Sequence, residues 1–178
     1  MWTNLNAAYE GLSDTFRSIV DGLKGVHRFE APASASKDNA YDESVRRRTM
    51  ESEHPLVRVH PETGQRQLFV SPSFLKSISG MSPAESQSML EFLWEHTVRP
   101  EFTVRFKWEP GDIAMWDNRS TSHLAPQDIF QSDFDRQLYR ITLVGDVPVG
   151  IDGKESTSLQ GAPILSVGEE MKLRAAAE

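Results

Sequence analysis

Residues 102–108 show the most regular pattern in the chain, because large apolar side chains alternate there with polar ones. The apolar positions are Phe102, Val104, Phe106 and Trp108. Successive side chains of a strand point to opposite faces of a sheet, so this pattern predicts a strand with one buried face. The sequence EPGD follows at 109–112, with proline and glycine where a type II turn needs them. Because residues 113–116 then return as a second strand, the stretch predicts a β-hairpin.

Further strands are predicted at residues 56–59, 67–70 and 137–144, from their apolar or alternating side chains. The sequence contains no internal repeat and no glycine-rich phosphate loop. With 178 residues the chain is long enough for one domain with a substantial core. We therefore expect a single domain over residues 1–178, mainly β with helical additions, arranged as an antiparallel sandwich or barrel.

The helical additions are expected in two places. Residues 2–24 carry two apolar stripes at helical spacing, interrupted at Ser13 and Asp14, either of which could cap the second piece. The sequence SPAE at 82–85 begins another helix, with a serine cap, a proline in the first turn and a glutamate three residues after the cap. We expect that helix to end near residue 98. Residues 31–53 are small, polar and charged without an apolar period, and they predict a flexible insertion.

Composition excludes several classes of protein and site. The chain has no cysteine, so disulfides, thiolate metal ligands and a cysteine nucleophile are ruled out. A formal net charge of −7 argues against a nucleic-acid partner, and the Arg46–Arg48 run lies among acidic residues typical of a solvated surface. No apolar run approaches a membrane span, and the first residues lack a secretory pattern. We expect a soluble, cytoplasmic protein without a membrane partner.

His123 is the first candidate for chemistry, because it ends the polar stretch WDNRSTSH directly after the predicted hairpin. A histidine there is either a surface residue that closes a loop or one ligand of a metal site. Without cysteine, the other ligands of such a site would be histidines, carboxylates or other oxygen groups. The pattern alone favours the loop histidine.

Arg136 and Arg140 are the second candidates, because period two places them on the same face of the last predicted strand, about 13 Å apart at about 3.3 Å per residue. A guanidinium is always charged and binds carboxylate or sulfonate oxygens through two parallel hydrogen bonds. If this face lined a barrel interior, the two charges would need anionic partners. The alternative, which the pattern alone favours, is the solvent-facing side of an ordinary sheet.

The order of WDNR, His123, Arg136 and Arg140 ahead of Gly145-Asp146-Val147-Pro148 resembles the C-terminal part of the taurine dioxygenase (TauD/TfdA) family. The segments HPLVRVHPETG (54–64), PEFTVRFKW (100–108) and WTNLNAAYEGLS (2–13) are also similar to that family. The likeness covers residues 2–150 and is weakest over 31–53. It leaves residues 150–178 as a C-terminal extension.

The resemblance implies a double-stranded β-helix (jelly roll) and an Fe(II)- and 2-oxoglutarate-dependent dioxygenase. In such an enzyme two histidines and one carboxylate hold the iron. His123 would be the distal histidine ligand, Arg136 would bind the far carboxylate of 2-oxoglutarate, and Arg140 would face the anionic group of the substrate. The implied reaction uses dioxygen to hydroxylate a small anionic organic substrate, which is a sulfonate, an alkyl sulfate or a carboxylate.

The family's other two ligands come from a His-x-Asp motif, and no His-x-Asp is present in the 178 residues. We therefore expect an N-terminally truncated member with an incomplete jelly roll, inactive by itself. His60-Pro61-Glu62 is a His-x-Glu that could replace the motif, and Asp117 is another carboxylate near His123, although both sequences are also explained by turns. A non-catalytic anion-binding module and a degenerate fragment remain alternatives, and the sequence leaves a homo-oligomer open.

Overall fold

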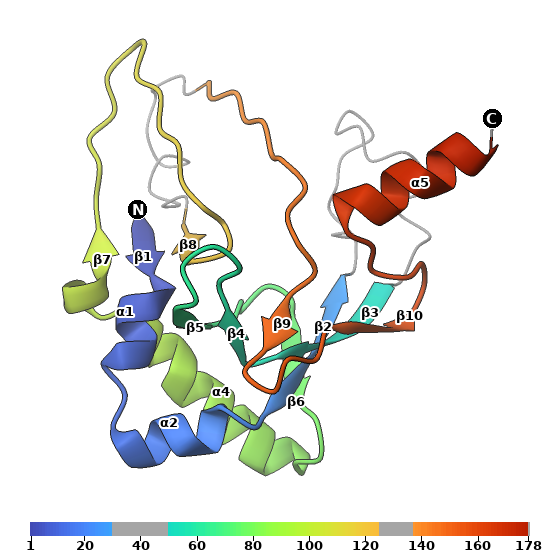
Figure 1. Ribbon diagram of the computed structural model, residues 1–178. Coiled ribbons are helices and arrows are strands. Elements are labelled where there is room, and N and C mark those ends of the chain that lie inside the picture. Colours follow the sequence, from blue (N-terminus) through green and yellow to red (C-terminus); the bar gives the residue numbers. More distant parts are fainter. Residues whose placement is uncertain (30–49, 125–136, 178) are drawn as a thin grey trace, which may run out of the picture.

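The computed structural model describes residues 1–29, 50–124 and 137–177 (Figure 1). In chain order its strands are β1 (Trp2–Asn4), β2 (Lys24–Phe29), β3 (Met50–Pro55), β4 (Val57–Val59), β5 (Arg66–Leu68), β6 (Leu75–Ile78), β7 (Thr103–Val104), β8 (Thr121–His123), β9 (Val149–Gly150) and β10 (Thr157–Gln160). They form three antiparallel sheets, with strand orders β7-β1-β8, β10-β3-β2-β6 and β5-β4-β9.

Side-chain caps begin the helices where the sequence predicts them. Ser13 accepts a hydrogen bond from the amide of Phe16, and Ser82 forms a reciprocal capping box with Glu85. The predicted helices in residues 2–24 and 82–98 are thus confirmed in type and approximate position. The helices are α1 (Leu5–Glu10), α2 (Asp14–Val20), α4 (Pro83–Thr97), the 3-10 helix η1 (Pro100–Phe102) and α5 (Val167–Ala177).

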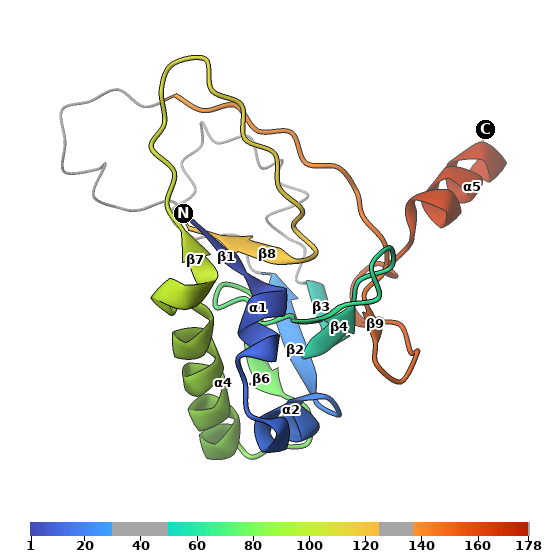
Figure 2. The ribbon, with the colours of Figure 1, turned by 60° about the vertical axis from the view of Figure 1, so that its left-hand side comes forward.

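The hydrophobic core lies where α1, α2 and α4 meet the sheets (Figure 2). Leu90 and Leu93 of α4, three residues apart and so on one face of the helix, are fully buried. Gly25 of β2 is required by close packing, because a Cβ there would lie 2.4 Å from Cδ1 of Leu75 and 2.9 Å from Cδ1 of Leu56. The core consists of Ala8, Tyr9, Leu12, Val20, Leu56, Val57, Leu68, Val70, Leu75, Ile78, Leu90 and Leu93.

The prediction of helix from residue 2 is wrong for Trp2–Asn4, which form β1 at the centre of a sheet. Trp2 lies opposite Val104 of β7 on one side and opposite His123 of β8 on the other. Pairing on both sides outweighs the weak helical preference of three residues. Asn4 then caps α1, because its side-chain oxygen accepts hydrogen bonds from the backbone amides of Asn6 and Ala7.

The flexible insertion predicted over residues 31–53 is wrong for its last four residues, because Met50–Pro55 form β3 between β2 and β10. Ion pairs between the glutamates of β3 and basic residues of β2 stabilise this polar segment as a strand. Glu51 forms an ion pair with Arg28 at 2.7 Å, and Glu53 forms one with Lys24 at 3.1 Å. Residues 30–49, the rest of the expected insertion, lie outside the described residues.

The predicted hairpin is wrong beyond its turn. Gly111 has a φ of 93° and Asp112 donates its amide to the carbonyl of Glu109 at 3.1 Å, so the turn is present. Of residues 102–108, however, only Thr103–Val104 pair, and residues 113–116 and 137–144 belong to no strand. The physical reason is that a strand needs a hydrogen-bonded neighbour, and the described part of the chain provides none beside these segments. None of the described helices is long and apolar enough to cross a membrane.

Candidate functional site

His123 is the last residue of β8 and lies opposite Trp2 of β1. Its imidazole is exposed, and the ring centroid is 5.2 Å from that of Trp116. The ring centroid of Trp116 in turn lies 5.2 Å from that of Trp2 in an edge-to-face arrangement, so two indoles pack beside the histidine. Sheet pairing and aromatic packing thus hold the backbone and one side of His123, while the residue as a whole remains exposed.

The guanidinium of Arg140 acts on His123 through space. Partial burial lowers the pKa of His123, and the positive charges of Arg140 and of the N-terminal ammonium lower it further. A lowered pKa keeps the imidazole neutral at pH 7, which is the form that binds a metal. The charge of Arg140 is therefore near enough to act on His123, and these are two of the three residues singled out by the sequence. Arg136, the third, lies outside the described residues.

The turn before β8 is held by Asp117. The amide and the hydroxyl of Thr121 both donate to the carbonyl of Asp117, at 3.0 Å and 2.6 Å. Its carboxylate accepts the amide of Arg119 at 2.7 Å, which closes the turn on the other side. The sequence DNRST is therefore a turn whose polar groups satisfy one another, and it fixes where β8 begins.

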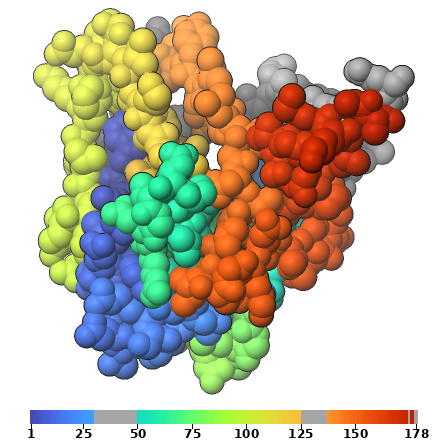
Figure 3. All heavy atoms as spheres, in the orientation of Figure 1, coloured from blue at the N-terminus to red at the C-terminus, as the bar shows by residue number. Residues whose placement is uncertain are grey.

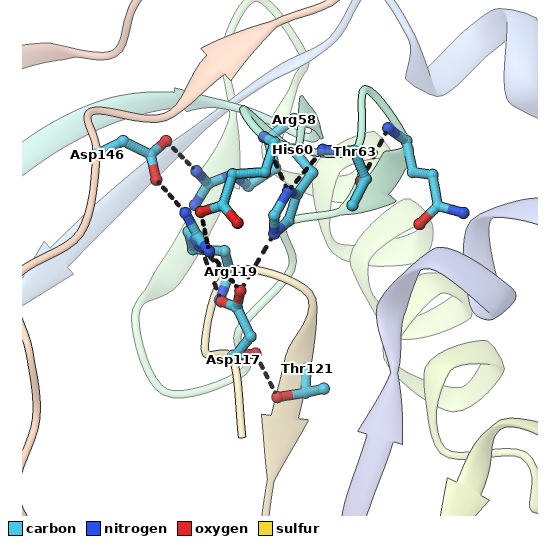
Figure 4. Close-up of polar contacts among 9 residues, drawn as sticks. Arg58, His60, Thr63, Asp117, Arg119, Thr121 and Asp146 are labelled. Carbon is cyan, nitrogen blue, oxygen red and sulfur yellow. Dashed lines mark hydrogen bonds and ion pairs between the residues drawn. The ribbon is translucent and has the colours of Figure 1, made fainter. Parts of the chain in front are cut away.

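Arg119 is the centre of a charged network between three segments (Figure 4). Its guanidinium binds both carboxylate oxygens of Asp117, at 2.7 Å to 3.0 Å, and lies 2.9 Å from Glu62. It also lies 3.6 Å from Asp146, which follows the 137–144 segment. The hydrogen bonds from Arg119 hold the pKa of Asp117 well below its usual range, and Asp117 and Glu62 raise the pKa of Arg119.

His60 is part of the same network, and both of its ring nitrogens are engaged. Nδ1 accepts the backbone amides of Glu62 and Thr63 at 3.2 Å and 3.3 Å, so the proton is on Nε2. Nε2 donates to Asp117 at 3.1 Å. The suggestion that His60 and Glu62 replace the missing metal-binding motif is therefore wrong, because the ring has no free nitrogen. Asp117 is equally occupied and serves the turn.

Arg58 completes the network from the interior, and sequence reasoning missed it. The residue is 3% exposed, and its guanidinium lies 2.5 Å from Asp146. Burial lowers the pKa of Arg58 while Asp146 raises it, and a guanidinium stays charged under these conditions. This pair joins β4 to the end of the 137–144 segment. The only signal in the sequence was an arginine between two valines in an otherwise apolar strand.

The described residues do not complete a metal centre. Among residues 1–29, 50–124 and 137–177, no three histidine, aspartate or glutamate side chains are grouped so that they could hold a metal ion. His123 offers one imidazole, and the carboxylate nearest to it in sequence among the described residues, Asp117, is bound to Arg119 and His60. One ligand does not satisfy the three-residue requirement of an iron site. The described residues could therefore supply one of the three ligands of such a site, the imidazole of His123.

Comparison with known proteins shows which family contains this chain. A family model described as "Taurine catabolism dioxygenase TauD, TfdA family" matches residues 1–142. The chain belongs to this family. A crystal structure of a taurine dioxygenase from Burkholderia xenovorans is 62% identical with a TM-score of 0.80, over 91% of this chain and 52% of that one. The expected fold class, mainly β with helical additions in an incomplete jelly roll, is confirmed by this likeness.

Two further relatives of this TauD-family chain are enzymes with sulfate-related names. The alpha-ketoglutarate-dependent sulfate ester dioxygenase of Pseudomonas putida is 40% identical over 163 residues, which are 88% of this chain and 53% of that protein. The alkylsulfatase of Acinetobacter baylyi is 39% identical over 166 residues, which are 89% of this chain and 51% of that protein. The chain spans about half the length of the relatives it matches.

Proposed function

We propose that this chain is the part of an Fe(II)- and 2-oxoglutarate-dependent dioxygenase that supplies one metal ligand and the anion-binding arginines. The observation that carries the proposal is the family match over residues 1–142, which includes His123, Arg136 and Arg140. The charge of Arg140 also lowers the pKa of the His123 imidazole. Family membership supports the same reaction class. The bound iron and 2-oxoglutarate would supply the oxidising chemistry with dioxygen, and the chain's own residues would bind and orient.

Each of the three residues has a separate role in the proposal. His123 donates its neutral imidazole to the metal, held in place by β1 and Trp116. Arg136 forms a two-point ion pair with the far carboxylate of 2-oxoglutarate. Arg140 binds the anionic group of the substrate, and its exposed side chain leaves the guanidinium free to do so.

The substrate we propose is an alkyl sulfate or a related small sulfonate. The names of the Pseudomonas putida and Acinetobacter baylyi relatives support this class. A sulfate or sulfonate group carries one negative charge and accepts hydrogen bonds from a guanidinium in a fixed geometry. The cytoplasmic location and the lack of a nucleic-acid partner stay predictions from the sequence.

We further propose that the chain has no turnover by itself. The described residues offer one imidazole toward a site that needs three protein ligands. A single side chain does not hold iron against competition from water. Activity would then require the ligands that come from the other half of the family fold.

The test compares this chain with a joined chain, in which it is fused to the half of the Burkholderia xenovorans protein that lies outside the match. Succinate release is measured with Fe(II), 2-oxoglutarate, ascorbate and an alkyl sulfate of six to eight carbons. We expect substrate-dependent succinate from the joined chain and none from the short chain. Turnover by the short chain would contradict its inactivity, and a folded joined chain without turnover would contradict the proposed reaction.

A second candidate is a non-catalytic module that binds a small anion. The observation that favours it is that the described residues group no second and third metal ligand with His123, which lies near the exposed Arg140. Calorimetry separates the two functions. Binding of an alkyl sulfate to the joined chain that is independent of Fe(II), without any succinate release, would favour the module.

A further inference from the structure

The two segments that carry His123 and Arg140 are held relative to one another by side chains. His123 ends β8, which pairs with β1 in the part of the chain that the structure describes. Arg140 lies in residues 137–144, which belong to no strand. The charge of Arg140 nevertheless acts on the imidazole of His123, so the two segments lie near each other. Contacts at their ends therefore decide how the two residues are placed.

Arg119 contacts the approach to β8 and the end of the 137–144 segment at once. Its guanidinium donates to both carboxylate oxygens of Asp117, at 2.7 Å to 3.0 Å. Nη1 of Arg119 lies 3.6 Å from Oδ1 of Asp146. A Cβ added at Gly145 would lie 4.0 Å from Cδ of Arg119, so the aliphatic stem of the arginine is close to the same turn. One side chain therefore bridges the two segments.

The bridge is anchored on β4 and the turn that follows it. Oδ2 of Asp146 lies 2.5 Å from Nη2 of Arg58, a buried residue of β4 that has a paired strand on each side. Arg119 also lies 2.9 Å from Glu62 in the β4–β5 turn. In the space-filling view this green turn lies between the yellow segment that leads to β8 and the orange segment that leads to β9 (Figure 3). The β4–β5 hairpin is thus the fixed frame for both segments.

The bridge requires the particular geometry of a guanidinium. Arg119 presents Nε and Nη2 to Asp117 and Nη1 toward Asp146 (Figure 4). These donors lie in one rigid plane, whereas a lysine offers a compact charge at the end of a flexible stem. The plane of the guanidinium therefore sets the direction from one carboxylate to the other. Because three carboxylates already engage it, Arg119 is suited to place other groups rather than to bind a substrate.

We propose that Arg119 is a positioning residue, which acts through Arg140 by setting where residues 137–144 lie relative to β8. The inference rests on the proposed function, in which Arg140 binds the anionic group of an alkyl sulfate. A misplaced Arg140 would bind that group less well in the ground state and in the transition state alike. Loss of Arg119 should therefore raise KM for the sulfate and leave kcat nearly unchanged.

The kinetic test uses the joined chain and an alkyl sulfate of six to eight carbons. Arg119→Gln should raise KM at least about 10-fold, with kcat changed less than about 3-fold, and Arg119→Lys should recover part of the loss. Arg99→Gln is the matched control, because Arg99 also pairs with a carboxylate two positions away, that of Glu101 at 2.7 Å. An unchanged KM in Arg119→Gln, or an equal rise in Arg99→Gln, would overturn the proposal.

A double variant separates positioning from an independent effect. If Arg119 acts through Arg140, then Arg119→Gln adds nothing to KM once Arg140→Gln has removed the binding group. The double variant should therefore have the KM of Arg140→Gln alone. Increases in KM that multiply in the double variant would show that Arg119 does not act through Arg140.

A distance measurement on this chain tests the same claim without turnover. The sequence has no cysteine, so Leu124→Cys and Val144→Cys provide one pair of spin-label sites, both exposed. In pulsed electron paramagnetic resonance, Arg119→Gln should make the distance distribution at least about twice as wide, and Arg99→Gln should leave it unchanged. An unchanged width in Arg119→Gln would overturn the proposal. Broadening, together with a joined chain that has no turnover, would contradict the proposed reaction and leave the positioning role intact.

Discussion

Nε2 of His60 donates a hydrogen bond of 3.1 Å to the carboxylate of Asp117, which lies 57 residues further along the chain. This contact joins the end of β4 to the turn that begins β8. Because His123 is the last residue of β8, the contact fixes the strand that carries the candidate ligand. The first prediction follows from the charge on Asp117.

Asp117→Asn is expected to lower the free energy of unfolding by about 1 to 2 kcal/mol, because charged hydrogen bonds to Arg119 are lost and an amide faces the N–H of His60. The asparagine oxygen still accepts the amide of Arg119, so the turn itself is retained. The measurement is urea unfolding followed by tryptophan fluorescence.

Asp152→Asn is the matched control for that variant. Asp152 also accepts the amide of a basic residue two positions on, Lys154, and forms a 3.5 Å ion pair with it. Both side chains of this pair are well exposed and screened by solvent, so the substitution should leave stability nearly unchanged. If the two variants lost the same stability, the network around Arg119 would contribute no more to the free energy of unfolding than an exposed ion pair.

The pair of Arg58 and Asp146 gives the second prediction. Asp146→Ala leaves the buried guanidinium without its closest partner and should cost about 3 kcal/mol, whereas Arg58→Met removes the buried charge and should cost less. The double variant should be more stable than Asp146→Ala alone. Equal costs for the two single variants would show that the buried charge is not the source of the loss.

His54 gives the third prediction, a loss of stability in acid. Burial, the neighbouring His27 and Arg58 lower the pKa of His54 to about 4, and burial also lowers the pKa of His27. The unfolded chain therefore binds more protons than the folded chain between about pH 4 and the ordinary histidine value of about 6.5. Stability should fall as the pH decreases through this window, by an amount on the order of 2 kcal/mol from His54.

His54→Phe tests the origin of that loss, because a phenylalanine can pack against His27 and Phe69 but does not titrate. Urea unfolding at pH 7.0, 6.0, 5.0 and 4.5 should show a shallower decline for the variant than for the original chain. An unchanged decline would assign the acid sensitivity to other groups.

Two identical capping boxes give the fourth prediction. Ser82 and Glu85 cap α4, whose Leu90 and Leu93 are in the core, so Ser82→Ala should cost about 1 kcal/mol of global stability. Ser166 and Glu169 cap α5 with the same hydrogen bonds, but Met171 and Leu173 of that helix are exposed. Ser166→Ala should therefore fray α5 and leave the global transition unchanged. A cooperative loss in both variants would show that α5 is part of the core unit.

Local signals explain what the sequence predicted well. The caps at Ser13 and Ser82 depend on residues within a few positions of one another, and the structure confirms both. The turn at Gly111 is predictable for the same reason, since proline and glycine restrict the backbone directly.

Contacts between distant residues explain what the sequence did not predict. Met50–Pro55 is a polar segment that is a strand because Arg28 and Lys24 pair with its glutamates. Arg58 and Asp146 meet across 88 positions, and no local pattern indicates such a pair. Residues 137–144 have the composition of a strand, but pairing depends on a neighbour that the described residues do not supply.

The central claim is that His123 supplies one ligand of an iron site completed by the other half of the fold. The most direct measurement is anaerobic calorimetric titration of Fe(II) into the joined chain, with His123→Ala and His54→Phe as matched histidine variants. We predict one Fe(II) per chain, binding weakened at least about 100-fold by His123→Ala, and binding unchanged in His54→Phe. Fe(II) binding that is the same in His123→Ala as in the unaltered joined chain would contradict the account.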